Sequence, residues 1–215
     1  MRINQFVAAA SGLSRRQADQ YLLENRITIN GQLPKIGQDI TLNDNVLLDG
    51  HKLTLSNKST TIILNKPTGY VCSRNGQGAK TVYELLPANL HHLKPVGRLD
   101  KDSSGLLLLT TNGQLAFDLT HPSKQKQKVY QITLNQPLNT DDQKAITRGI
   151  KLPDGISALN LEGSGKQWTI TMHEGKNRQI RRTFAALDYK VLTLQRTHFG
   201  SYQLKSLAIG NFRFI

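Results

Sequence analysis

The 215-residue sequence contains little of what disulfide-linked, metal-centred or membrane proteins require. Its single cysteine, Cys72, excludes an intrachain disulfide framework and most structural zinc sites, and a lone cysteine is usually a small buried hydrophobe. Its apolar runs fall far below the roughly 18 residues of a membrane span, and the polar start Met1–Asn4 lacks the apolar core of a signal peptide. We therefore expect a soluble, cytoplasmic protein.

Acidic residues are also few: 15 Asp and Glu stand against 28 Lys and Arg, which gives a formal net charge of +13. Residues 1–58 hold 7 basic and 5 acidic side chains, so most of the excess, a net +11, belongs to residues 59–215. Clustered basic side chains gain affinity for polyanions by releasing counterions from phosphates. The composition therefore favours a nucleic acid as the partner.

The polar stretch Ser56–Thr61 separates these two parts, and its composition is typical of a short connection between structural units. We place a domain boundary there, with one domain at residues 1–57 and the other at residues 58–215. The sequence contains no internal repeat and no low-complexity tract.

The first domain is predicted to contain two short helices and a small strand-rich part. Apolar residues at helical spacing over residues 3–10 predict the first helix. Ser14, with Gln17 three residues later, forms the capping-box pattern that begins the second helix. Residues 27–29 and 46–48 are predicted strands, each followed by a pair of turn-forming residues.

Two arginines, Arg15 and Arg16, occupy the first turn of the second helix, where cations oppose the helix dipole. An external anion would relieve this cost, and a solvated helix start is the equally good alternative. Over residues 1–50 the sequence resembles the small RNA-binding domain named after ribosomal protein S-four, on the motifs Arg2–Phe6, Ser14–Ala18, Ile27–Gly31 and Lys35. The resemblance implies RNA contacts for Arg2, Ser14, Arg15, Arg16 and Lys35.

The second domain alternates predicted strands with occasional helices. Strands are expected at residues 61–64, 106–111, 129–134 and 168–172, and helices at residues 114–119 and 179–187. This order predicts an α+β fold, with a small N-terminal αβ domain followed by a domain built on a mixed, largely antiparallel sheet with flanking helices.

The most informative stretch is Val96–Thr110, which sets Asp100 beside an arginine and ahead of a continuous apolar strand. A carboxylate is costly there unless it is paired or hydrogen-bonded, so the position is a candidate for chemistry. An aspartate in an ordinary turn is the structural alternative. The run also imitates the start of a calcium loop, but its twelfth position is Thr111 instead of Glu. We expect no metal site.

Two further elements can join Asp100 in one site. Tyr130 lies on a predicted strand and carries a hydroxyl, although a tyrosine packed in the core is the alternative. Arg178, Arg181 and Arg182 are three and four residues apart and share one face if a helix begins among them. Because like charges repel, phosphates or a buried carboxylate would relieve the cost of this cluster.

The second domain is similar to the catalytic domain of bacterial ribosomal RNA pseudouridine synthases of the RsuA type. The resemblance spans residues 62–213, and its motifs follow the family's order: Asn65-Lys66-Pro67-x-Gly69-Tyr70, Gly97-Arg98-Leu99-Asp100, Lys128-x-Tyr130, Glu174-Gly175-Lys176-Asn177-Arg178-Gln179-Ile180-Arg181-Arg182, and Leu194-x-Arg196-x-x-x-Gly200 with Leu204. It implies that Asp100 is the catalytic aspartate, Tyr130 the active-site tyrosine and Arg181 the basic partner of the aspartate. Arg178 is the second choice for that partner.

The resemblance also implies a reaction. Uridine is converted to its C-glycoside: the bond from C1′ to N1 breaks, the uracil rotates, and C1′ joins C5. Asp100 would act as the nucleophile at the sugar or as the base at C2′, and an arginine would keep it ionised. Tyr130 would stack on the uracil and help to remove the C5 proton. Because the isomerisation needs no redox step and no external group transfer, no cofactor is expected.

The expected partner is ribosomal RNA, presented as a loop or bulge from which the target base is flipped. The residues of this domain expected to hold the RNA are Lys66, Arg98, Lys124, Lys126, Lys128, Lys176, Arg178 and Arg182. The sequence of residues 177–182 slightly favours a resemblance to the enzymes that act on large-subunit RNA. Since no interface or membrane signal stands out, we expect a monomer without a protein or membrane partner.

Two other classes of protein remain open on the sequence. A non-catalytic RNA-binding protein of ribosome assembly would explain the charge and the first domain, but it would not need Asp100 together with Tyr130. A glycosidase or nucleosidase normally needs a second carboxylate across the scissile bond. Asp102 is too close to Asp100 along the chain to supply it.

Overall fold

The computed structural model describes residues 1–41, 43–55 and 59–215, and the chain divides into two compact units, Met1–Ser59 and Thr60–Ile215. The boundary expected between residues 57 and 58 lies outside the described residues. Within those residues, none of the helices has both the length and the apolar character needed to cross a membrane.

The N-terminal unit pairs two helices with a small antiparallel sheet. Its elements are α1 (Ile3–Ser11), α2 (Arg15–Leu23), β1 (Ile27–Ile29), β2 (Val46–Leu48) and β3 (His51–Lys52), with the strands in the order β1-β2-β3. The predicted capping box at the start of α2 is present, because Ser14 and Gln17 exchange side-chain to backbone hydrogen bonds. Apolar residues of both helices and of β1 and β2 form one buried cluster.

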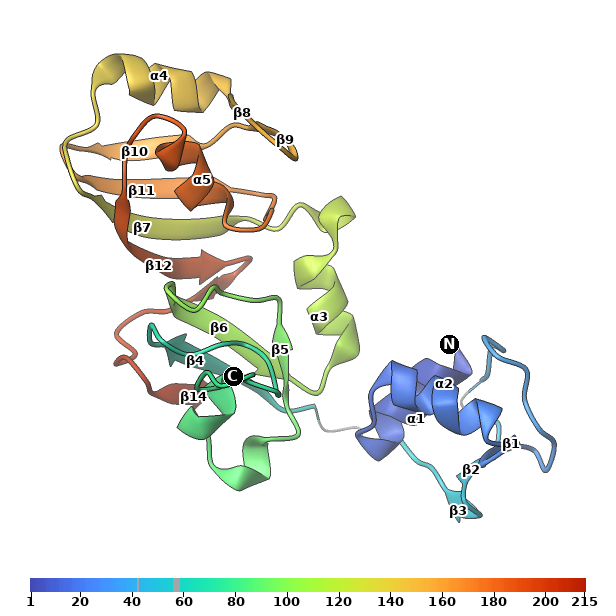
Figure 1. The fold of residues 1–215 in the computed structure, drawn as a ribbon. Helices are drawn as coiled ribbons and strands as arrows, with labels where there is room; N and C mark the ends of the chain where they lie inside the picture. The colour runs from blue at the N-terminus through green and yellow to red at the C-terminus, as the bar shows by residue number, and fades with distance from the viewer. Residues whose placement is uncertain (42, 56–58) are drawn as a thin grey trace. The chain divides into compact units, whose positions relative to one another are not determined.

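The C-terminal unit is built on a nine-stranded sheet with the main order β10-β11-β7-β12-β6-β4-β14, while β13 pairs with β12 and β5 with β6. The strands are β4 (Thr61–Lys66), β5 (Lys94–Val96), β6 (Ser104–Thr110), β7 (Lys128–Leu134), β10 (Asn160–Ser164), β11 (Gln167–Met172), β12 (Val191–Phe199), β13 (Tyr202–Gln203) and β14 (Phe212–Phe214). Figure 1 shows the sheet as two groups of strands that meet where β12 lies beside β6.

Helices and short turns flank this sheet. They are α3 (Gly113–Thr120), α4 (Thr140–Arg148), α5 (Gln179–Ala185), three 3₁₀ turns, η1 (Val82–Leu85), η2 (Ala88–Leu90) and η3 (Pro122–Lys124), and a separate hairpin of β8 (Ile150–Leu152) and β9 (Gly155–Ser157). Among the described strands of the large sheet, only β6 and β12 pair in parallel. The predicted α+β class with a mixed, mostly antiparallel sheet is confirmed.

Strands β4 and β6 lie at the centre of one half of the sheet, and their sequences explain this position. Both are apolar at successive residues, as expected for strands covered on both faces. Ile62 and Leu107 belong to one buried cluster, whereas the neighbouring Ile63 and Leu106 belong to another. These two clusters occupy opposite faces, because successive side chains of a strand alternate.

The sequence pattern did not predict β12, although this strand joins the two halves of the sheet. Its burial does not alternate regularly, and its pairing with β7 shifts register between Val191 and Thr193 and again between Arg196 and His198. Such bulges interrupt the period of two from which a strand is predicted.

Close contact between β6 and β12 depends on Gly105. Its φ is +102°, and a Cβ atom at this position would lie 2.3 to 2.9 Å from backbone atoms of Arg196. Any larger residue would strain its own backbone and push the two strands apart.

We expect Gly105→Ala to lower the free energy of unfolding by more than about 2 kcal/mol, because backbone strain and overpacking add. Urea unfolding followed by circular dichroism measures this change. Gly113→Ala is the matched control, since a Cβ at Gly113 meets no atom within 4 Å. Equal stability of the two variants would contradict the importance of the close approach.

Candidate active site

A cavity of about 920 Å³ opens in the C-terminal unit, in the region where β7 and β12 meet the loop before β6. It is lined by residues of the β5–β6 loop, of β7, β11 and β12, and of the segment that leads into α5. Asp100 and Tyr130, which are 30 positions apart in the sequence, both line it. The cavity therefore collects the aspartate and the tyrosine that the sequence singled out.

Asp100 lies in a loop that is held by its own backbone. The Asp100 carbonyl accepts hydrogen bonds from the Ser103 amide at 3.1 Å and from the Lys66 ammonium at 3.0 Å. The amide and carbonyl of Leu99 contact the Cys72 sulfur, each at 3.4 Å, and burial raises the pKa of this thiol. The Asp100 side chain itself is 33% exposed. The loop is thus fixed while its carboxylate stays accessible.

Lys66 does not lie on the surface, so its predicted contact with RNA is wrong. It is fully buried at the end of β4, and its ammonium donates to the carbonyls of Pro67, Asp100 and Ser103 at 3.0, 3.0 and 2.7 Å. Burial lowers the pKa of this lysine, because desolvation disfavours its charged form. Lys66 anchors the loop that carries the aspartate.

Arg178 makes the closest cationic approach to the Asp100 carboxylate among the described ion pairs, with Nη1 3.9 Å from Oδ2. Its stronger contact is with Asp102, whose two carboxylate oxygens accept bonds from Nη1 and Nη2 at 2.8 and 2.7 Å. This bidentate pair holds the pKa of Asp102 below its ordinary range. Asp102, which the sequence indicated only as part of a turn, therefore orients the arginine beside Asp100.

The expected pairing of Arg181 with the Asp100 carboxylate is not found among the described contacts. Arg181 Nη2 donates to the Asp102 carbonyl at 2.8 Å, Nη1 donates to the Val191 carbonyl at 2.7 Å, and Nε lies 3.3 Å from Asp102 Oδ2. The start of α5 at Gln179 is the reason, because it turns Arg181 towards the loop backbone and β12. The second choice, Arg178, has the ion pair instead.

Tyr130 is buried in β7, with 9% of its surface exposed, and lines the cavity. It faces Ile170 of β11 on one side and Arg196 of β12 on the other. Directly paired residues of antiparallel strands place their side chains on the same face. Tyr130 therefore stands next to a buried arginine that the sequence had marked only as part of a motif.

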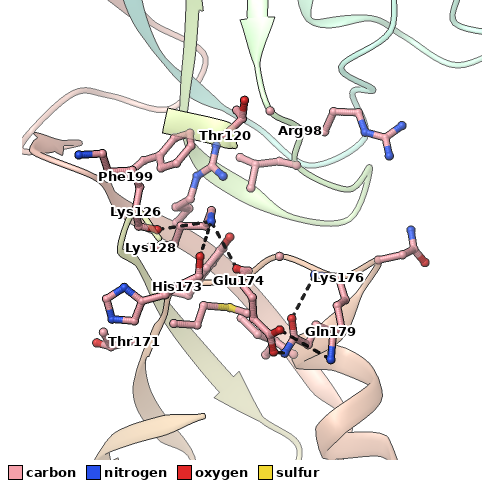
Figure 2. Close-up of a pocket in the computed structure, with 18 of the residues that line it drawn as sticks. Arg98, Thr120, Lys126, Lys128, Thr171, His173, Glu174, Lys176, Gln179 and Phe199 are labelled. Carbon is pink, nitrogen blue, oxygen red and sulfur yellow. Dashed lines mark hydrogen bonds and ion pairs between the residues drawn. The ribbon is translucent and has the colours of Figure 1, made fainter. Parts of the chain in front are cut away.

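The other predicted RNA-contact residues of this unit differ in how far their side chains are engaged in hydrogen bonds and ion pairs within the protein. Lys128 donates to the carbonyls of Lys126, His173 and Glu174 at 3.4, 3.1 and 3.4 Å, and Figure 2 shows these bonds on one wall of the cavity. Burial lowers the pKa of Lys128, and the positive charge of Arg196 lowers it further. The Lys128 ammonium therefore holds the segment before α5 in place, and the residue is only partly exposed to solvent.

Lys176 and Arg182 also have internal partners. Lys176 donates to the Ile156 carbonyl at 2.9 Å, and Arg182 forms a bidentate pair with Asp154 at 2.9 and 2.8 Å. Lys124 lies 3.7 Å from an Asp118 carboxylate oxygen and remains about half exposed. The remaining predicted contacts, Arg98 and Lys126, are exposed and line the cavity.

The predicted RNA contacts of the N-terminal unit lie on its surface. Arg2, Arg15, Arg16 and Lys35 are exposed, and Ser14 is occupied as the cap of α2. They belong to a different compact unit from the cavity.

Sequence reasoning missed a polar network around Gln179 in the lining of the cavity. The Gln179 amide donates to the Ser157 hydroxyl at 3.0 Å and to the Glu174 carboxylate, and its oxygen accepts the Lys176 amide at 3.1 Å. Glu174 and Lys176 lie within five residues of Gln179, but Ser157 is 22 positions away, and no local pattern indicates that contact. In the described parts of the chain, no group of three or more His, Cys, Asp or Glu side chains could hold a metal ion.

A cavity that gathers cations around a carboxylate and a tyrosine is typical of an enzyme with an anionic substrate. Residues 60–186 match the family model described as RNA pseudouridylate synthase. The chain therefore belongs to the RNA pseudouridylate synthase family, and it is an isomerase, an RNA pseudouridine synthase.

Named relatives and a solved structure agree with this assignment. The chain is 34% identical over 221 residues to ribosomal small subunit pseudouridine synthase A of Pasteurella multocida, covering 99% of this chain and 95% of the relative. It is 32% identical over 223 residues to ribosomal large subunit pseudouridine synthase B of Bacillus subtilis, covering 99% and 91%. A crystal structure of a pseudouridylate synthase superposes with a TM-score of 0.72 at 33% identity, covering 100% of this chain and 96% of the other.

The Asp102–Arg178 pair predicts a pH-dependent stability. The pKa of Asp102 is lower in the folded than in the unfolded protein. The ionised Asp102 therefore adds to the free energy of unfolding above the ordinary pKa of 3.8, and this stabilisation is lost as the pH falls through the lower folded-state pKa. The stability difference between wild type and Asp102→Asn, measured by urea unfolding, should therefore be larger at about pH 6 than at about pH 3. The exposed Asp188→Asn is the control, and an equal pH dependence there would show only general acid sensitivity.

Proposed function

We propose that this enzyme isomerises a specific uridine of ribosomal RNA, with Asp100 as its catalytic carboxylate. The two named relatives cover nearly the whole chain, and one is named for the small and the other for the large ribosomal subunit. The sequence of residues 177–182 slightly favours large-subunit RNA as the substrate. Such a substrate also implies a cytoplasmic enzyme, which we expect to act as a monomer.

The observation that carries this proposal is the position of Asp100. Its carboxylate is accessible in a cavity that also exposes Tyr130, while the backbone behind it is fixed by a buried ammonium. A carboxylate held in this way can attack C1′ or remove a proton from C2′ without reorganising the loop. Arg178 lies on one side of it, with Nη1 3.9 Å from the Asp100 Oδ2 atom.

Tyr130 has the position needed to receive a flipped uracil. Its ring lines the cavity within the sheet, so a base that leaves the RNA stack can pack against it. After the uracil has turned, the tyrosine hydroxyl, directly or through water, assists removal of the C5 proton. The exposed Arg98 and Lys126 hold the RNA backbone at the mouth of the cavity.

The N-terminal unit supplies additional RNA affinity in this proposal. Its exposed arginines, Arg15 and Arg16, occupy the first turn of α2, and that turn contains no acidic residue. The helix dipole and these side chains together favour a phosphate at this position. The two units thus combine a docking surface with a catalytic cavity.

Ribosomal RNA labelled with tritium at uridine C5 tests the reaction. Wild type should release tritium while the RNA strand stays intact and the base stays attached. Asp100→Asn should bind the RNA with an affinity close to that of wild type and release tritium at least about 10³-fold more slowly, because the nucleophile or base is lost.

Asp141→Asn is the matched control, since Asp141 is almost fully exposed on α4 and does not line the cavity. Near-normal release by Asp100→Asn would refute the catalytic assignment. Release of free uracil would indicate a glycosidase, and binding without any release would indicate an RNA-binding protein without activity.

The basic segment between α3 and β7 predicts a salt dependence. The logarithm of RNA affinity falls as the logarithm of the salt concentration rises. Replacement of Lys124 and Lys126 by Gln should make this fall less steep, by about 0.7 in slope for each phosphate that is no longer neutralised. Replacement of Lys144 and Lys151, which do not line the cavity, is the control. An unchanged slope in the Lys124 and Lys126 variant would remove this segment from the RNA-binding surface.

A further inference from the structure

Arg196 is a buried cation that the proposed mechanism does not yet use. It is 2% exposed and is among the largest fully buried side chains of the chain. Its Nε donates to the Leu106 carbonyl at 2.8 Å, whereas its buried Nη2 has no hydrogen-bond partner. No carboxylate forms an ion pair with it among the described residues. A buried charge without such compensation is costly, which indicates that a ligand completes it.

The surroundings of Arg196 raise this cost further. Its guanidinium lies 4.6 Å from the centre of the Phe199 ring, and the Lys128 ammonium lies 5.5 Å from the same ring. Two cations therefore share one aromatic ring, and Arg196 contributes to lowering the pKa of Lys128. A ring quadrupole offsets part of a cation's desolvation but does not replace a hydrogen-bond acceptor. The free Nη2 group still needs an oxygen.

The depth of Arg196 decides which part of the RNA can supply that oxygen. Arg196 lines the cavity and is paired directly with Tyr130 across β7 and β12. Phosphates of the backbone would meet the exposed Arg98 and Lys126 first. Only a group that enters the cavity can reach a side chain as buried as Arg196, and in a base-flipping enzyme that group is the uracil.

We propose that Arg196 is a further catalytic residue, which donates a hydrogen bond to a carbonyl oxygen of the flipped uracil and stabilises the negative charge that develops on the ring. This inference rests on the proposed function of the same cavity. Uracil carries its two acceptor oxygens, O2 and O4, on the ring itself. A fixed guanidinium in a site that excludes water stabilises such a charge more than it would in solution.

The charge arises when the C1′–N1 bond breaks. Its electron pair leaves with the uracil and spreads over N1, O2 and O4, while the sugar either forms a bond from C1′ to Asp100 or loses its C2′ proton to Asp100. When C5 then joins C1′, the Asp100 oxygen is displaced or the proton returns to C2′. The C5 proton is lost and N1 gains one, so the sequence balances as an isomerisation. Arg196 assists only while the uracil is anionic.

The test is the rate of pseudouridine formation in a single turnover at saturating RNA, measured beside RNA affinity. We expect Arg196→Met to lower this rate about 10²- to 10³-fold, the usual loss when one such donor is removed. RNA affinity should change less than about threefold, since the donor acts mainly in the transition state. Arg196→Lys, which keeps the charge but loses the planar fork, should be at least about tenfold faster than Arg196→Met.

Arg74→Met is the matched control. Arg74 also donates to a carbonyl, that of Leu93 at 3.3 Å, and packs over a ring, that of Tyr83 at 4.7 Å, but it does not line the cavity. Its substitution should leave the single-turnover rate within about twofold of wild type. Because Arg74 is exposed, the comparison tests only whether loss of an arginine–ring contact outside the cavity lowers the rate, and the Lys and Gln variants of Arg196 separate packing from charge.

Several outcomes would overturn the inference while leaving the proposed function intact. One is an Arg196→Met variant with a near wild-type rate. Another is weaker RNA binding with a reduced salt slope and an unchanged rate, which would assign Arg196 to a phosphate. If Arg196→Met does not fold, Arg196→Gln replaces it, and equal rates for the Gln and Lys variants would show that the charge is not used. Inactivity of the wild type would instead refute the proposed function.

Discussion

The site depends on one buried ammonium. Lys66 stands at the end of β4, and its three donors satisfy three carbonyls of the neighbouring loops, including that of Asp100. A chain that turns away from the sheet leaves these carbonyls without strand partners, and such groups are costly when buried. A single flexible lysine solves this problem for both loops. The position of the Asp100 carboxylate is therefore fixed through its backbone, so its side chain remains accessible in the cavity.

The cations around the cavity divide into two groups. Arg178, Arg181 and Arg182 are each matched by Asp102 or Asp154, and these pairs shape the segment before and within α5. Arg196 has no carboxylate partner among the described residues, and Lys128 donates only to carbonyls in the bonds described. The three arginines with carboxylate partners help to build the wall of the cavity. Arg196 and Lys128, which have no carboxylate partner in the bonds described, create the positive field that an electron-rich substrate meets. A count of basic residues in the sequence cannot distinguish the two groups.

Sequence patterns predicted the parts of the fold that strong local signals encode. The apolar runs of β4 and β6, the strand with Tyr130 and the helix after Arg178 are present where they were expected. The contacts of Lys66 with Asp100 and of Arg181 with Asp102 could not be predicted, because each joins segments more than 30 positions apart. Strand β12 was missed because bulges break its period. Asp100 and Tyr130 were singled out from sequence motifs, and both line the cavity, while their roles stay predictions.

The location of the cavity follows from the way in which the two halves of the sheet meet. Strands β6 and β12 are in register over only two pairs, Ser104 with Gln195 and Gly105 with Arg196, whereas β12 follows β7 along its length. Beyond so short a junction the two halves can separate, and side chains from three strands and one loop can face the same space. Gly105 permits the close approach, and Arg196 lies directly across from it. The same contact that holds the sheet together therefore brings the buried cation beside Tyr130.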